Sequence, residues 1–181
     1  LFAIKKAEQC ESPLLIKGEL GCGDEYQLKI LEMRARGRFG CLYRALNKST
    51  NEVVAVKQFS QQHVLSWLNE QRIYRMECMR VDHPGLLKFI GSQHLRFLSG
   101  SELVDEYRII TEFHQRGSLY DLLKERQVSL EEMAKIAVSM AAGLSYMHQS
   151  SSNADAPHIP ETSCSPKATK PSIAHRDFKS K

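Results

Sequence analysis

The pattern of apolar and polar positions predicts a sheet in the first part of the chain. Apolar and polar positions alternate over residues 27–34, which indicates a first strand. A second strand is predicted from Cys41 to Leu46, a polar turn over residues 47–51, and a third strand from Glu52 to Lys57. Because residues 53–56 form an unbroken apolar run, we expect this third strand to be covered on both faces.

A helix is predicted next, from Gln61 to Met79. One of its faces carries, at helical spacing, His63, Trp67, Glu70 and Tyr74. A carboxylate in a partly aromatic stripe needs a partner if it is buried. The alternative is that Leu65 and Leu68 define the buried face, which would leave that carboxylate in water.

Pro84 and Gly85 end this helix. The pattern then predicts a strand over residues 86–91, a loop over residues 92–105 and a β-rich run over residues 107–113.

The later part of the chain is predicted to be helical. Ser118 to Glu125 indicates a short helix, and Ser129 with Glu132 forms a capping box that opens a longer one. This second helix carries a stripe that we expect to be core, made of Met133, Ile136, Ala137, Met140, Ala141, Leu144 and Met147.

Residues 149–170 are rich in Ser, Thr, Ala and Pro and contain no aromatic residue. Such a segment buries too little apolar surface to offset the entropy of ordering it, so we expect a flexible loop that proteases cut first. His158 and Cys164 are isolated there, which favours solvent-facing side chains over a metal site.

Composition narrows the class of protein. The 181 residues carry a formal net charge of +4, spread along the chain without a basic stripe interleaved with aromatics, which argues against nucleic-acid binding. The five cysteines form no C-x-x-C pair, which favours a reducing compartment over a disulfide framework or a zinc site. No run of 18 apolar residues is present. Because the chain begins at Leu1, we expect a fragment.

The candidate chemistry begins with two glycines. Gly37 and Gly40 allow a tight turn and close approach to a ligand, and Lys57 follows at the end of the apolar run. An ammonium beside a buried sheet needs an anionic partner. A glycine hairpin near a cation is a plausible cradle for phosphate groups.

These residues resemble the Gly-rich loop and the strand-β3 lysine of protein kinases. Ala35 stands where the family has a leading glycine, and Leu42 stands where it has valine. The resemblance implies nucleotide contacts from these positions and from Ala55, and an ion pair between Lys57 and Glu70.

The resemblance extends to the segment that follows the sheet. It places Thr111 as the gatekeeper, Glu112 and His114 as backbone contacts to adenine in the hinge, and Ser118 near the ribose.

The last residues resemble the H-R-D catalytic loop, as His175-Arg176-Asp177. By this match Asp177 accepts the proton of the attacking hydroxyl. Lys179 takes the place of the lysine that steadies the γ-phosphate in serine/threonine kinases, which favours transfer to Ser or Thr.

Three segments narrow the resemblance to activin type II receptors of the transforming growth factor-β receptor family. They are residues 34–41, 66–70 and 170–177. The likeness covers residues 27–148 and 170–181, and residues 1–27 lack the Gly-Ser run of type I receptors.

The implied fold is α+β and protein-kinase-like, with a complete small lobe (antiparallel sheet plus helix αC) and a truncated helical large lobe. The expected organisation is a juxtamembrane lead-in over residues 1–27, the small lobe over 28–112, the hinge over 113–117, and the start of the large lobe over 118–181.

The implied function is a receptor serine/threonine kinase that uses ATP with Mg²⁺ or Mn²⁺ and phosphorylates type I receptor kinases as partners. The resemblance implies a cell-membrane receptor that binds an extracellular growth factor through a missing domain, with this segment in the cytoplasm. The metal ligands would lie beyond Lys181, so we expect the 181 residues alone to be inactive. We also expect them to aggregate, because the helices that would cover the apolar face of residues 133–147 would be missing. The alternative is a catalytically inactive nucleotide-binding or dimerisation module.

Overall fold

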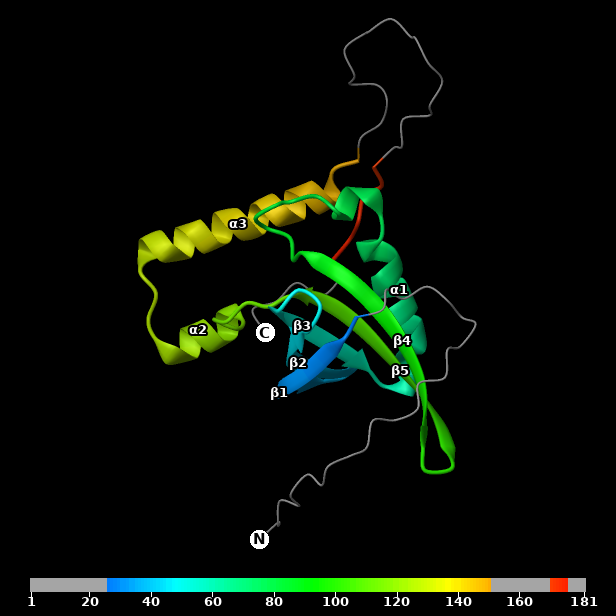
Figure 1. Ribbon diagram of the computed structural model, residues 1–181. Helices are drawn as coiled ribbons and strands as arrows, with labels where there is room; N and C mark the ends of the chain where they lie inside the picture. Colours follow the sequence, from blue (N-terminus) through cyan, green and yellow to red (C-terminus); the bar gives the residue numbers. More distant parts are fainter. Residues whose placement is uncertain (1–25, 151–169, 176–181) are drawn as a thin grey trace, which may run out of the picture. The chain divides into compact units, whose positions relative to one another are not determined.

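The computed structural model describes residues 26–150 and 170–175, which divide into two units (Figure 1). Within the described residues, the first unit comprises residues 26–76 and 89–113. The second comprises residues 77–88, 114–150 and 170–175. Residues 77–88, which the sequence analysis assigned to the small lobe, therefore group with the second unit.

The first unit is built on one antiparallel sheet of five strands, in the order β1-β2-β3-β5-β4. Its strands are β1 (Leu28–Gly37), β2 (Gly40–Asn47), β3 (Glu52–Phe59), β4 (Phe89–Ser99) and β5 (Glu102–Glu112). The first three predicted strands are confirmed, and β1 and β3 each run a few residues further than the pattern indicated.

The central strand β3 divides the apolar core between the two faces of the sheet. On one face the buried residues are Ala45, Val54, Val56 and Ile110. On the other face they are Phe59, Trp67 and Ile109. The prediction that residues 53–56 are covered on both faces is correct for Val54, Ala55 and Val56 but wrong for Val53, which is 38% exposed at the start of the strand.

The prediction of a loop over residues 92–105 is wrong, because this segment forms most of the β4–β5 hairpin. Its turn contains Gly100 with a φ of +65°. Its polar side chains form pairs across the two strands. The Asp105 carboxylate accepts from His94 at 2.7 Å and from Arg96 at 2.8 Å. The ring of Tyr107 stacks on that of His94 with centroids 4.6 Å apart. Cross-strand pairing makes a polar strand stable, and sequence alternation does not reveal it.

The predicted helix over residues 61–79 is interrupted. It consists of a 3-10 turn (Gln61–His63), the helix α1 (Val64–Tyr74) and a second 3-10 turn (Glu77–Met79). Beyond α1 the backbone tightens, because Met76 N–H donates to the carbonyl oxygen of Ile73, three residues back, at 3.1 Å.

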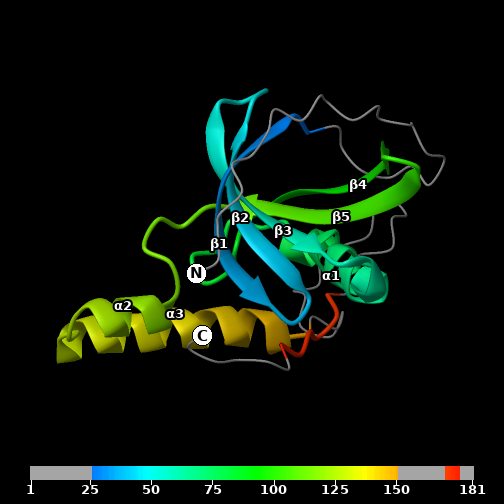
Figure 2. The ribbon, with the colours of Figure 1, turned by 90° about the horizontal axis from the view of Figure 1, so that it is seen from below.

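One face of α1 packs on the sheet (Figure 2). Trp67 is buried, and its indole N–H donates to the carbonyl oxygen of Arg108 in β5 at 3.0 Å. Leu65 and Leu68 are 71% and 48% exposed, so they do not form the buried face. The stripe that contains Glu70 is therefore the one turned toward the sheet.

The second unit contains α2 (Leu119–Glu125) and α3 (Leu130–His148), and each begins with a capping box. The predicted box of Ser129 and Glu132 is confirmed. A further box at α2 joins Ser118 and Asp121. It was not predicted, and its Asp121 departs from the usual pattern, which has Glu or Gln three residues after the cap.

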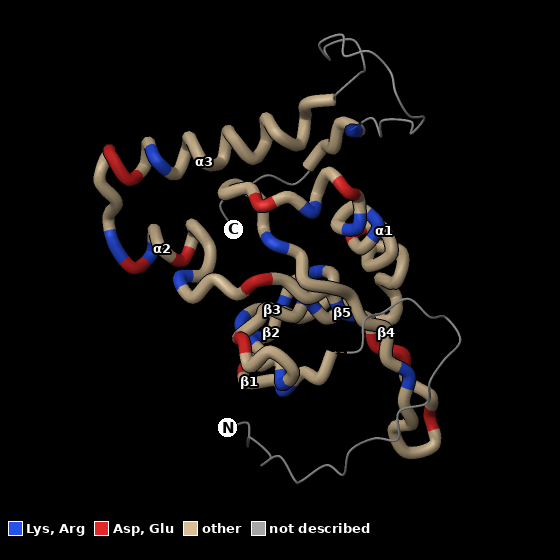
Figure 3. The backbone as a smooth tube through the Cα atoms, turned by 45° about the horizontal axis from the view of Figure 1, so that its top comes forward, with Lys and Arg blue, Asp and Glu red and all other residues tan. Residues whose placement is uncertain are grey.

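The apolar stripe of α3 is only partly core among the described residues. Met147 is buried, as is Gly143 beside the stripe, whereas Met133 is 38% exposed. Charged residues of α3 gather at its N-terminal end (Figure 3). None of the helices in the described ranges is long and apolar enough to cross a membrane.

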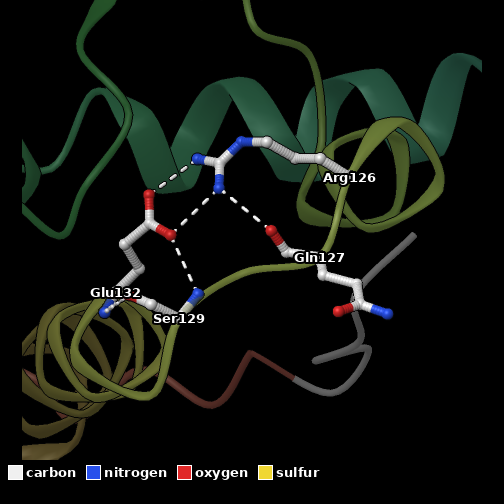
Figure 4. A network of polar contacts seen from close by, with 4 residues as sticks. All are labelled: Arg126, Gln127, Ser129 and Glu132. Carbon is white, nitrogen blue, oxygen red and sulfur yellow. Dashed lines mark hydrogen bonds and ion pairs between the residues drawn. The ribbon is translucent and has the colours of Figure 1, made fainter.

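The N-terminus of α3 is fastened to the preceding segment by an ionic network (Figure 4). The two terminal nitrogens of Arg126 donate to the carboxylate of Glu132 at 2.7 and 2.9 Å, and Ser129 N–H donates to the same carboxylate at 2.9 Å. These hydrogen bonds lower the pKa of Glu132 from 4.5 to about 2, and the hydrogen bond from Arg126 has the largest effect.

We expect replacement of Glu132 by Gln to loosen the first turn of α3. Since the pKa is lower in the folded chain, the carboxylate stabilises the fold fully above pH 4.5, and this contribution disappears as the pH falls toward 2. Amide hydrogen exchange in residues 130–133 measures this. Glu131→Gln is the control because its pair with Lys135 is largely exposed, and equal exchange in both variants would contradict the prediction.

Candidate functional site

The hairpin that joins β1 to β2 is shaped by its glycines. Gly37 pairs with Gly40 across the turn. Gly40 has a φ of +152°, and a Cβ there would lie 1.9 Å from the carbonyl oxygen of Gln58, so only glycine fits. A Cβ at Gly37 would meet no atom within 4 Å. The hairpin therefore lies tightly on β3 at one glycine and is open at the other.

The predicted ion pair is present beside this hairpin. Lys57, on β3, places its Nζ 2.6 Å from the Glu70 carboxylate on α1. The two side chains are 35% and 30% exposed. The hydrogen bond to the carboxylate holds the lysine side chain in place. Since an ammonium group has three N–H donors and the pair is only half-buried, the lysine can still donate to an anion that approaches from solvent.

The sheet also carries the other predicted residues of the first unit. Ala35 pairs with Leu42 across β1 and β2, and Leu42 in turn pairs with Lys57 across β2 and β3. Ala55 and Thr111 are both buried and pair across β3 and β5.

Glu112 ends β5 and pairs with Val54. Its carbonyl oxygen accepts from the hydroxyl of Thr111 at 3.3 Å.

His114 and Ser118 belong to the second unit. The Ser118 hydroxyl accepts from Asp121 N–H at 3.2 Å and donates to the Asp121 carboxylate at 2.7 Å, so it is engaged as the N-cap of α2. Asp177 and Lys179 lie outside the described residues. The structure thus groups the predicted residues of the sheet and α1 in the first unit, and it places His114 and Ser118 in the second.

One supporting contact is absent from the sequence prediction. The ring of Tyr74, one turn after Glu70, stacks on Phe89 of β4 with centroids 5.0 Å apart and planes at 6°. Burial, and secondarily the charge of Glu70, raise the pKa of Tyr74 to about 12, so its hydroxyl is neutral. This stack fixes α1 against the sheet near the ion pair. Helical spacing indicated Tyr74, but no local signal indicated its partner.

The described residues contain no group of three or more His, Cys, Asp or Glu side chains that could hold a metal ion. The half-buried lysine and the open glycine hairpin suit an anionic, phosphate-bearing ligand.

A five-stranded antiparallel sheet with a glycine hairpin and a Lys–Glu pair to its helix is the small lobe of a protein kinase. Residues 31–155 match the protein kinase domain, and the chain belongs to this family. It is 43% identical over 154 residues to activin receptor type-2A of Xenopus laevis, and 41% identical to that of Homo sapiens. Identity to activin receptor type-2B of Xenopus laevis is 43%.

These alignments cover 85% of this chain but only 26–27% of each relative. The chain thus spans about a quarter of the length of the curated relatives it matches. The resemblance to activin type II receptors is confirmed.

Proposed function

We propose that this chain forms the ATP-binding part of a receptor serine/threonine kinase. The observation that carries the proposal is the Lys57–Glu70 ion pair beside the glycine hairpin. Lys57 supplies a charge for the phosphates, Glu70 holds that charge in position, and the hairpin supplies backbone N–H groups. Phosphoryl transfer depends mainly on such positioning and charge stabilisation.

The adenine and ribose are assigned to the remaining predicted residues. Ala55 and Thr111, two small residues that pair across β3 and β5, are proposed to contact the flat adenine base. The backbones of Glu112 and His114 are proposed to contact adenine. Ser118 is a weaker candidate for the ribose, because its hydroxyl already caps α2.

ATP is proposed to bring Mg²⁺ or Mn²⁺, which neutralises phosphate charge. Because the described residues offer no metal cluster, the metal is not assigned to any of them. Asp177 is proposed to accept the proton of the attacking hydroxyl, and Lys179 to steady the γ-phosphate. These two roles rest on the sequence match alone.

The substrates, partners and location of the whole receptor are proposals too. The relatives are named activin receptors. We propose that the protein phosphorylates type I partner receptors on Ser or Thr. It would do so from the cytoplasmic side of the cell membrane, after a growth factor of the activin type binds a domain outside these residues.

ATP binding by the 181-residue chain tests the proposal, measured by isothermal titration calorimetry. We expect Lys57→Met to weaken binding about 10- to 100-fold, because a charge-assisted hydrogen bond to phosphate is lost. Lys48→Met, at the exposed β2–β3 turn, is the matched control and should bind like the parent chain. Equal affinity of the Lys57→Met and parent chains would refute the assigned site.

A further inference from the structure

The tip of the glycine hairpin is tied to the segment that joins β3 to α1. Ser60 N–H donates to the carbonyl oxygen of Phe39 at 3.2 Å, extending the β2–β3 ladder past its last pair. The Ser60 hydroxyl lies 2.6 Å from Nδ1 of His63. The rings of Phe39 and His63 meet edge to face, with centroids 5.4 Å apart and planes at 86°. We call these three residues the hairpin tether.

The hairpin tether lies at the edge of the proposed phosphate site. Nζ of Lys57 is 5.8 Å from the centroid of the Phe39 ring. Phe39 is 38% exposed, so its position depends on these surface contacts rather than on burial in the core. Any change that releases Phe39 therefore changes the tip of the hairpin near the lysine side chain.

The role of His63 in the hairpin tether can be separated from a role in the helix. His63 precedes α1 at the N-cap position, but its side chain makes no capping hydrogen bond. Its ring instead faces the hairpin and the Ser60 hydroxyl. Removing the ring should therefore leave α1 intact.

We propose that His63 is a positioning residue for the nucleotide, and that with Ser60 it holds the hairpin tip beside Lys57 before the nucleotide arrives. This inference rests on the proposed function, since it assigns His63 to the same phosphate site. A glycine-rich hairpin loses much conformational freedom when it is ordered. Contacts that order it in the free chain reduce the entropy lost on binding, which increases affinity.

The test uses the whole 181-residue chain and two readouts. In His63→Ala, exchange of the Ser60 amide hydrogen should accelerate in the nucleotide-free chain, and ATP affinity should fall about 3- to 10-fold. His63→Phe keeps an aromatic ring against Phe39 but loses the hydrogen bond with the Ser60 hydroxyl, so it should restore both in part. Ser60→Ala should show an intermediate loss, because it removes only the hydroxyl. Leu65→Ala is the control, since that side chain is 71% exposed on α1.

The outcomes separate this inference from the proposed function. Unchanged amide exchange in His63→Ala overturns the hairpin tether. Accelerated exchange with unchanged ATP affinity overturns the positioning role and leaves the proposed function standing. A parent chain that shows a protected Ser60 amide but binds no ATP overturns the proposed function, and the positioning role with it.

Discussion

Replacing Asp177 by Asn should reduce phosphoryl transfer by about 10²- to 10⁴-fold, because the amide cannot accept the proton of the attacking hydroxyl. The assay requires the rest of the catalytic machinery. It therefore uses a chimera in which residues 1–181 are followed by the remaining part of the kinase domain of human activin receptor type-2A. Incorporation of labelled phosphate into a type I receptor kinase domain on Ser or Thr is the measurement.

Lys57→Arg in the same chimera should also reduce transfer, by about 10²-fold or more, because a planar guanidinium does not replace a compact ammonium paired with Glu70 at 2.6 Å. Lys48→Arg is the control. Turnover that survives Asp177→Asn would refute the catalytic assignment. A folded chimera that binds ATP without transferring phosphate would support the alternative of an inactive nucleotide-binding module.

The ion pair could be predicted from sequence because three signals agree on it. The apolar run of β3 ends at Lys57, helical spacing places Glu70 on the face of Trp67, and the motif order matches a kinase. The capping box at Ser129 could be predicted equally well, since it depends on two residues three positions apart in the sequence. The apolar run, the helical spacing and the capping box each involve residues close in the sequence, so the sequence alone predicts the structure that they form.

The β4–β5 hairpin could not be predicted in the same way. Its polar strands depend on partners across the sheet, above all the contacts of Asp105 with His94 and Arg96. The hairpin tether of Phe39, Ser60 and His63 was also missed, because it joins residues more than twenty positions apart with no motif of its own. Both features are properties of the assembled sheet.

A third case of contact between distant residues concerns two glycines of the second unit, Gly85 and Gly143. A Cβ on Gly143 of α3 would lie 2.4 Å from the carbonyl oxygen of Gly85, and a Cβ on Gly85 would lie 2.8 Å from the backbone nitrogen of Gly143. In both cases the obstructing atom belongs to the backbone. Neither glycine can therefore gain a side chain unless one segment moves.

The contacts around these glycines limit such movement. The ring of His83 accepts from Gly85 N–H at 3.0 Å and lies 5.0 Å from the ring of Tyr146. The Tyr146 hydroxyl donates to the carbonyl oxygen of Cys78 at 2.7 Å. Residues 77–88 are thereby attached to α3 through Tyr146, three residues after Gly143.

We expect Gly143→Ala to lower the free energy of unfolding of the second unit by about 1–3 kcal/mol, because the added methyl group overpacks a backbone contact. The sign of this change in stability tests the close contact, since Gly→Ala at an open helical position is instead stabilising by about 1 kcal/mol. Val138→Ala, at a site 69% exposed on the same helix, is the control and should change little. Hydrogen exchange of the α3 amides in increasing denaturant gives the free energy. A Gly143→Ala chain as stable as the parent would show that α3 and residues 77–88 do not pack this closely in solution.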